Sequence, residues 1–299
     1  MARLQIVDFH SHYAGPGFEL TTLVGVPPGG QALWTRVNGL LTDPVALVAS
    51  VEESGIAARV VSMPLEFLAD PDGHVSTEVI RRVNDTIAET VRRLPGRLYG
   101  LATVDAYAGE PAARELRRAV EELGLRGAFV ESAKGDLLPD AAQARPTFAA
   151  AAELGVPVFL HPVPDRPLHA RFGRYGRAGA RLMRSTINSA ALVAMVESGM
   201  LDELPGLRVV LTALAIGGVF IAGELRGRNV YIDTTGLHPV AVRSAVDLLG
   251  AGRVLMGTDW PVVLETPERI EAVLAAAGLD AADRRKIAGE NTLELLGVA

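Results

Sequence analysis

Eight short runs of apolar, largely β-branched residues recur along the chain, and they limit its fold more than any other feature. Segments with the apolar spacing of an amphipathic helix lie between them, such as Thr77 to Arg93, Thr186 to Leu204 and Pro239 to Leu249. Strands that are apolar almost throughout are typical of a parallel sheet whose faces are both covered. Eight alternations of strand and helix therefore predict an α/β fold, a closed (β/α)8 TIM barrel. The runs are Gln5 to His10, Ala58 to Pro64, Leu98 to Asp105, Gly127 to Ser132, Pro157 to Pro162, Arg208 to Leu214, Val230 to Thr235 and Val254 to Pro261.

The chain length suits one barrel of this kind, so we expect residues 1–299 to form a single domain. A doubly wound open sheet is the rival architecture, but it usually has a glycine-rich phosphate-binding turn after its first strand, where this chain has His10 and His12. Two insertions, at about residues 13–43 and 163–185, interrupt the otherwise short loops. Each insertion follows a strand, and loops after strands lie on the catalytic face of a barrel, so both are expected to wall the active site.

Composition excludes several kinds of function. The net charge is −6 and no block of basic residues occurs, so neither nucleic acid nor an anionic membrane is expected as a partner. The chain has no cysteine, which excludes disulfides and thiolate metal sites. Its N-terminus lacks a basic segment followed by a long apolar run, so we expect a cytoplasmic protein that acts on a small molecule.

Three histidines and one aspartate stand at the ends of predicted strands. His10 ends the first run and His12 comes two residues later, and they project to the same side because side chains alternate along a strand. His161 ends the fifth run and Asp259 lies in the last. Strand ends converge around the mouth of a barrel, so these four side chains can meet there. Three imidazoles and a carboxylate suit one divalent ion, with Zn²⁺ expected first and Mn²⁺, Fe²⁺ or Co²⁺ as alternatives.

Several motifs are shared with a known family. They are Asp8-Phe9-His10-Ser11-His12, the stretch Asn84 to Asp105, the run Leu123 to Gly127, Leu160-His161-Pro162, Gly257-Thr258-Asp259-Trp260-Pro261 and Gly289-Glu290-Asn291. With these, the chain resembles the amidohydrolase-related metal-dependent hydrolases over nearly its whole length, in the branch that includes the aminocarboxymuconate semialdehyde decarboxylase-like enzymes. The resemblance implies a (β/α)8 barrel with a metal, commonly zinc, held by His10, His12, His161 and Asp259. Similar proteins are often dimers, so a homodimer is left open.

The chain departs from this family pattern after the sixth strand. Members usually carry a histidine there, which serves as a catalytic acid/base or as a ligand to a second metal, whereas this chain has Ala213. Alanine can neither bind a metal nor move a proton. We therefore expect one metal rather than two, and we expect a decarboxylation mechanism like that of the family to lack its proton-transfer group.

Metal-assisted hydrolysis does not require the histidine that Ala213 replaces. A bound zinc ion lowers the pKa of its water to roughly 7, and Asp259 would act as the general base. The favoured hypothesis is thus a mononuclear hydrolase that cleaves a C–N or C–O bond in an amide, a lactone or a similar small molecule, acidic or aromatic. The alternatives are a non-oxidative, metal-dependent decarboxylase of an aromatic or unsaturated acid, and a barrel that binds metal or ligand with impaired catalysis.

Substrate-binding residues are expected in the second insertion and beside the last ligand. Arg171 and Arg174, with Arg177 and Arg184 nearby, could hold a carboxylate, which guanidinium binds well. Trp260 could form an aromatic wall beside Asp259. His169 and His238 are candidate proton donors, since both follow predicted strands on the side of the mouth.

Overall fold

The strands of the barrel lie where the apolar runs are. The computed structural model describes residues 4–21, 30–70, 74–163, 165–212, 221, 223–225, 227–236 and 238–299. Within these ranges each predicted run contains a strand, and the run from Leu98 is divided in two at Leu101. The strands are β1 (Val7–His12), β2 (Ala58–Ser62), β3 (Leu98–Gly100), β4 (Ala102–Thr103), β5 (Ala128–Glu131), β6 (Pro157–His161), β7 (Arg208–Leu211), β8 (Val230–Asp233) and β9 (Val254–Leu255).

Parallel pairing joins these strands into a closed barrel. One sheet has the order β1-β2-β3 and the other runs in order from β4 to β9, with every neighbouring pair parallel. Backbone hydrogen bonds join the last strand region to the first, among them Phe9 N to Met256 O at 2.8 Å and His12 N to Trp260 O at 2.7 Å. The predicted (β/α)8 barrel is therefore confirmed, and its last ligand segment pairs directly with its first.

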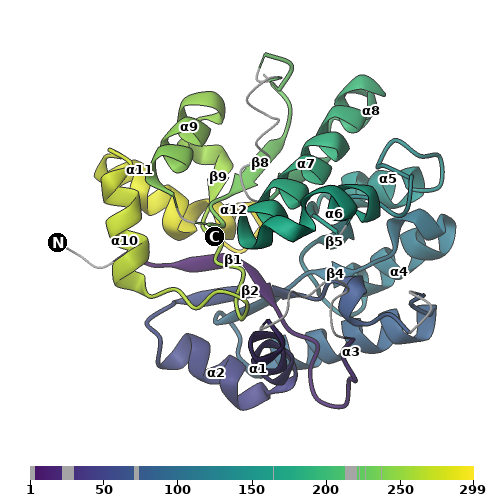
Figure 1. The fold of residues 1–299 in the computed structure, drawn as a ribbon, viewed down its shortest axis with the longest axis horizontal. Coiled ribbons are helices and arrows are strands. Elements are labelled where there is room, and N and C mark those ends of the chain that lie inside the picture. The colour runs from purple at the N-terminus through teal and green to yellow at the C-terminus, as the bar shows by residue number, and fades with distance from the viewer. Residues whose placement is uncertain are drawn as a thin grey trace.

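Helices cover the outside of the barrel (Figure 1). Helix starts follow local sequence signals: the Asp43 side chain accepts hydrogen bonds from the first turn of α2, which has Pro44 at its first position, and Ser76 caps α3 in the same way. The described helices are α1 (Gln31–Thr42), α2 (Pro44–Glu52), α3 (Thr77–Arg93), α4 (Glu110–Glu121), α5 (Arg145–Leu154), α6 (Arg166–Phe172), α7 (Gly176–Glu197), α8 (Met200–Glu203), α9 (Pro239–Leu249), α10 (Pro267–Ala276), α11 (Ala281–Arg285) and α12 (Asn291–Leu295).

Aromatic rings fill the barrel below its mouth. Phe9, Phe129 and Phe159 are buried and pack edge to face, with ring centroids 5.2 Å apart for Phe9 and Phe159 and 5.6 Å for Phe129 and Phe159. The His10 ring lies 4.9 Å from Phe159, and the His161 ring lies 5.1 Å from Phe129. The barrel interior is thus a packed core, and the histidines stand on top of it.

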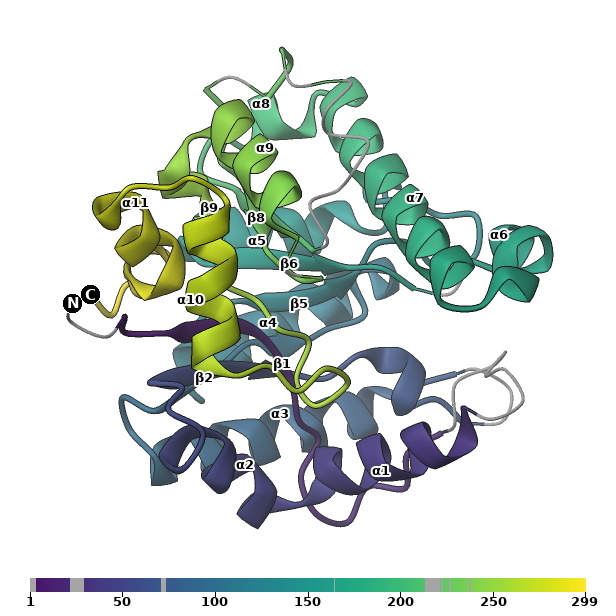
Figure 2. The ribbon, with the colours of Figure 1, turned by 60° about the vertical axis from the view of Figure 1, so that its left-hand side comes forward.

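The second insertion is helical, which the sequence did not indicate. It contains α6 and the first turns of α7, which project together at the right of Figure 2. The sequence predicts one helix from Thr186 to Leu204, whereas α7 starts at Gly176 and ends at Glu197. Gly199, with φ 76°, follows the end of α7 and separates it from α8. Among the described helices, none is long and apolar enough to cross a membrane.

Candidate metal centre

The structure brings the four expected ligands together at the mouth of the barrel. One ligand atom from each of His10, His12, His161 and Asp259 lies within 4.8 Å of the others. The Nε2 atoms of His10 and His12 are 3.1 Å apart, and Asp259 Oδ1 is 3.3 Å from His12 Nε2. Three imidazoles and one carboxylate that converge in this way fit a single divalent ion.

Oxygen atoms on the far side of the His10 ring set its orientation. His10 Nδ1 donates to Asp233 Oδ2 at 2.7 Å, and the Oγ1 atoms of Thr235 and Thr212 lie 2.8 and 3.1 Å from the same nitrogen. Because a carboxylate can only accept, Nδ1 carries the proton and Nε2 presents its lone pair to the cluster. His161 Nδ1 is buried without a hydrogen-bond partner in the described part of the chain, as expected of a nitrogen that would coordinate a metal.

The segment that carries Asp259 is held in an unusual conformation. Asp259 has φ 70°, in the left-handed region that few residues other than glycine adopt. Its backbone N donates to His10 O at 2.9 Å, which ties the last ligand to the first. A side chain on Gly257 would meet the Cβ atoms of His10 at 2.9 Å and Asp233 at 3.0 Å, so this position requires glycine.

A buried aspartate behind the metal ligands joins the two motifs. Asp8 accepts hydrogen bonds from His10 N at 3.1 Å, Ser11 Oγ at 2.8 Å, Thr258 N at 2.9 Å and Thr258 Oγ1 at 2.6 Å. It also forms an ion pair with the buried Arg59. The sequence analysis gave no role to Asp8 or Asp233. The only available signal was an acidic residue inside an otherwise apolar strand.

Electrostatics in the cluster follow from burial and charge. Burial alone would lower the pKa of His10, but the charge and hydrogen bond of Asp233 raise it above its ordinary value. Burial lowers the pKa of His12, and burial with the neighbouring histidines lowers that of His161 further. Burial opposes ionisation of Asp259, yet its hydrogen bond to His12 and the nearby positive charges hold its pKa below the usual range. Neutral imidazoles and an ionised carboxylate are the forms that bind a metal.

Two acidic residues, Glu66 and Glu131, and one arginine, Arg184, lie beside the cluster. The sequence analysis named Arg184 but not Glu66. Glu66 follows β2, and Glu131 ends β5. Burial, with the charge of Glu66 added, raises the pKa of Glu131 to about 8. Burial also raises the pKa of Glu66, which Arg184 opposes. The Arg184 guanidinium lies 3.5 Å from Glu66 Oε1.

Other residues singled out by the sequence lie elsewhere. Arg171 and Arg174 are exposed on α6 and the short turn after it, where the Arg174 guanidinium stacks on the Tyr175 ring at 4.9 Å. Trp260 is only 4% exposed and packs against Arg59. His238 is exposed and His169 is half-buried. Ala213 lies outside the described residues.

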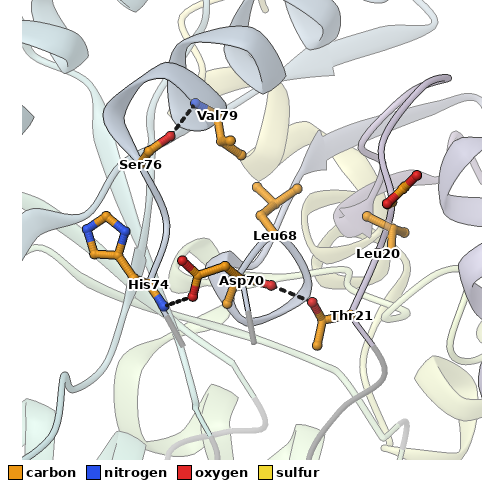
Figure 3. Close-up of a pocket in the computed structure, with 9 residues that line it drawn as sticks. Leu20, Thr21, Leu68, Asp70, His74, Ser76 and Val79 are labelled. Carbon is orange, nitrogen blue, oxygen red and sulfur yellow. Dashed lines mark hydrogen bonds between the residues drawn. The ribbon is translucent and has the colours of Figure 1, made fainter. Parts of the chain in front are cut away.

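A cavity of about 430 Å³ opens between the segments after β1 and β2. Figure 3 shows Leu20 and Thr21 on one wall and Asp70 and His74 on the other. Asp70 accepts a hydrogen bond from His74 N at 2.9 Å, and Thr21 Oγ1 donates to Ala69 O. None of the four metal-site residues lines this cavity.

Known proteins are similar to this chain in sequence and in fold. The amidohydrolase family model matches residues 7–298. The chain belongs to the amidohydrolase family. A gamma-resorcylate decarboxylase from Polaromonas sp. (strain JS666 / ATCC BAA-500) is 30% identical over 296 residues, covering 88% of this chain and 90% of that protein. A 2-amino-3-carboxymuconate-6-semialdehyde decarboxylase from Dictyostelium discoideum is 25% identical over 281 residues, covering 86% of this chain and 77% of that protein. This amidohydrolase-family chain therefore falls in the branch that the sequence resemblance indicated.

A solved structure has the same fold as this chain. A dihydroxybenzoic acid decarboxylase from Polaromonas sp. JS666, with bound manganese and the inhibitor 2-nitroresorcinol, superposes with a TM-score of 0.80 at 23% identity, covering 99% of this chain and 97% of that one.

These comparisons correct the expected reaction. The sequence analysis favoured a hydrolase because Ala213 removes the usual proton-transfer histidine, but the similar proteins are decarboxylases, so that expectation is wrong. The hydrolase expectation was weak in physical terms because the same ligand set supports both reactions, so the loss of the usual histidine at Ala213 does not decide between them. The expectation of zinc has no support either, since the metal bound in the solved relative is manganese.

Proposed function

We propose that this protein is a metal-dependent, non-oxidative decarboxylase of an aromatic carboxylic acid. The observation that carries the proposal is the convergence of His10, His12, His161 and Asp259 at the barrel mouth of a chain that matches decarboxylases over most of its length. These four residues would hold one divalent ion, with manganese as the first candidate. When bound, the ion would bind oxygen atoms of the acid and stabilise negative charge that develops on the ring.

Asp259 is the residue that we assign to proton transfer. Decarboxylation breaks the bond between the ring and the carboxylate, carbon dioxide leaves, and the electron pair left on the ring carbon takes a proton. Asp259 is a quarter exposed, so it can exchange protons with solvent at the mouth. Its lowered pKa keeps Asp259 ionised at rest, so the proton would come from solvent. Asp259 would take a proton from a water molecule at the mouth and pass it to the ring carbon, and the hydroxide left behind would leave with the solvent.

Asp233 and Asp8 would act on this site without touching the substrate. Asp233 holds the His10 ring, and Asp8 fixes the backbone of both ligand segments. Both are fully buried, so they keep their positions as the substrate enters and leaves.

The reaction is tested by incubating manganese-loaded protein with 2,6-dihydroxybenzoate and, separately, with panels of lactones and amides. We expect release of carbon dioxide from the aromatic acid and no hydrolysis. Asp259→Asn should lower turnover by about 10²-fold to 10⁴-fold, in a variant whose metal content is measured alongside. Hydrolysis of a lactone or amide without any decarboxylation would overturn the proposal.

A further inference from the structure

Helix α7 is anchored to the strand ends that surround the metal site. Asn188 Nδ2 donates to Thr212 O at 3.2 Å, just beyond β7, and Asn188 Oδ1 accepts from Ser132 Oγ, just beyond β5. Ser132 Oγ also lies 3.0 Å from His161 O. These contacts bury one face of α7 against the mouth of the barrel.

Arg184 lies one helical turn before Asn188 on the same face of α7. Its Nη1 donates to Pro162 O at 3.1 Å, next to the ligand His161. Its Nη2 approaches Glu66, so the guanidinium lies between the segments that follow β6 and β2, and its positive charge contributes to the lowering of the pKa values of His12, His161 and Asp259. Arg184 is 29% exposed, whereas Arg181, on the preceding turn of the helix, is exposed.

The partner of Arg184 in this structure is held only loosely. Arg184 Nη2 is 3.5 Å from Glu66 Oε1, which is too long for a good hydrogen bond. Both carboxylate oxygens of Glu66 are buried, and neither has a hydrogen-bond partner within the described ranges. A buried carboxylate without hydrogen bonds is costly, and the guanidinium beside it has N–H groups that can donate to a better acceptor.

We propose that Arg184 binds the carboxylate of the substrate, and that Glu66 is the weak partner that the substrate displaces. This assignment rests on the proposed function, because it names the group that recognises the acid at the same site. A guanidinium binds a carboxylate through two parallel hydrogen bonds, which the longer contact to Glu66 does not supply. Once carbon dioxide has left, the product has no carboxylate, and Arg184 returns to Glu66. The exchange therefore favours binding of the acid over binding of its product.

Calorimetric titration of the manganese-loaded protein tests this assignment without relying on turnover. The probes are benzoate and its uncharged analogue benzamide, neither of which carries the ring hydroxyls of the decarboxylase substrates. Arg184→Gln should weaken benzoate binding by about 10-fold to 100-fold and change benzamide binding less than about 2-fold. Glu66→Gln should change benzoate affinity in the opposite direction, tightening it by about 3-fold or more, because it frees the guanidinium and removes a like charge. Arg181→Gln, on the exposed face of the same helix, is the matched control and should bind both probes as the unmodified protein does.

Several results would overturn the assignment. Benzoate binding that survives Arg184→Gln would do so, as would equal loss of benzoate and benzamide, which indicates a structural role. Failure of the unmodified protein to prefer benzoate to benzamide would also overturn it. If Arg184→Gln does not fold, the opposite shift expected for Glu66→Gln decides, and an unchanged affinity there contradicts the proposal. Carbon dioxide release from 2,6-dihydroxybenzoate is measured separately, so the proposed reaction can fail while the Arg184 assignment stands.

Discussion

At the scale of single residues, the position of His10 depends on a carboxylate 223 positions further along the chain. Asp233 Oδ2 accepts a hydrogen bond from His10 Nδ1, and Thr212 Oγ1 in turn donates to Asp233 Oδ1 at 3.1 Å. Partners of this kind fix the tautomer of a ligating histidine and raise its basicity. The affinity of the site for metal should therefore depend on a residue that is not itself a ligand.

Asp233→Asn tests this dependence. The asparagine keeps the shape of the side chain but removes the charge that raises the pKa of His10. We expect the affinity for manganese to fall by about 10-fold to 100-fold in a competition titration against a chelator. Asp247→Asn, at an exposed position on α9, serves as the control and should leave the affinity unchanged. Equal affinity for manganese in the Asp233 variant and the unmodified protein would show that Asp233 does not affect metal binding by the four ligands.

Glu131 gives a prediction about pH and stability. Its pKa is raised from 4.5 to about 8 in the folded protein, so folding favours the protonated form. The stability that this contributes is fully present below about pH 4.5 and is lost as the pH rises through about 8. In chelator-treated protein, Glu131→Gln should therefore match the unmodified protein near pH 5 and be more stable near pH 9 by about 1 kcal/mol or more, measured by urea unfolding. A difference that stays the same at both pH values would contradict the raised pKa.

The metal ligands could be predicted from the sequence, but the residues that hold them in place could not. His10, His12, His161 and Asp259 could be predicted because strand ends of a barrel must converge. Glu66 and Asp233 could not, since their importance comes from contacts between segments far apart in the chain. The assignment of Arg171, Arg174 and Trp260 to substrate binding stays a prediction, and the structure favours Arg184 for the carboxylate.

At the scale of elements, α7 shows why helix boundaries were harder to predict than strands. Its first turns, around Arg181 and Leu182, are exposed, so they lack the apolar periodicity that marks a helix packed along its whole length. Gly179 lies under α6, where a Cβ atom would come within 2.0 Å of Phe172 O. The glycine lowers helix propensity but permits this close packing, and only the folded structure reveals it.

The anchor of α7 can be tested through Asn188. This residue is fully buried, and its removal leaves Thr212 O without its donor. Asn188→Ala should lower the free energy of unfolding by about 2 kcal/mol, as judged from urea titration. Thr186→Ala changes an exposed position on the same helix and should alter stability by less than about 0.5 kcal/mol. If the two variants lose equal stability, α7 is not fixed through Asn188.

Family motifs outside the site also acquire a structural explanation. Asn84 donates to Thr103 O at 3.0 Å and accepts from Thr103 N at 2.8 Å, which joins α3 to β4. Gly289 packs so closely on β1 that a Cβ atom would lie 2.5 Å from Gln5 O, and Asn291 donates to Val254 O at 2.8 Å. These residues maintain the barrel rather than the chemistry, a distinction that the sequence alone does not make.

At the scale of the whole molecule, barrel closure makes the metal site possible. Pairing of the first strand with the segment after β9, through the parallel bridge between Ser11 and Trp260, places His10 beside Asp259, although these two ligands are 249 positions apart in the chain. The fold could be predicted because eight apolar strands alternating with helices have few alternatives. The reaction could not, because the same ligand set can hold a metal that activates water for hydrolysis or one that supports cleavage of the C–C bond to a carboxylate.

The most direct test of a one-metal decarboxylase is a titration of metal-free protein with manganese while carbon dioxide release from 2,6-dihydroxybenzoate is recorded. We expect the rate to rise in proportion to added manganese and to reach a plateau at one ion per chain. Release of carbon dioxide that is independent of metal, a plateau at two ions per chain, or no release at full loading would contradict the account.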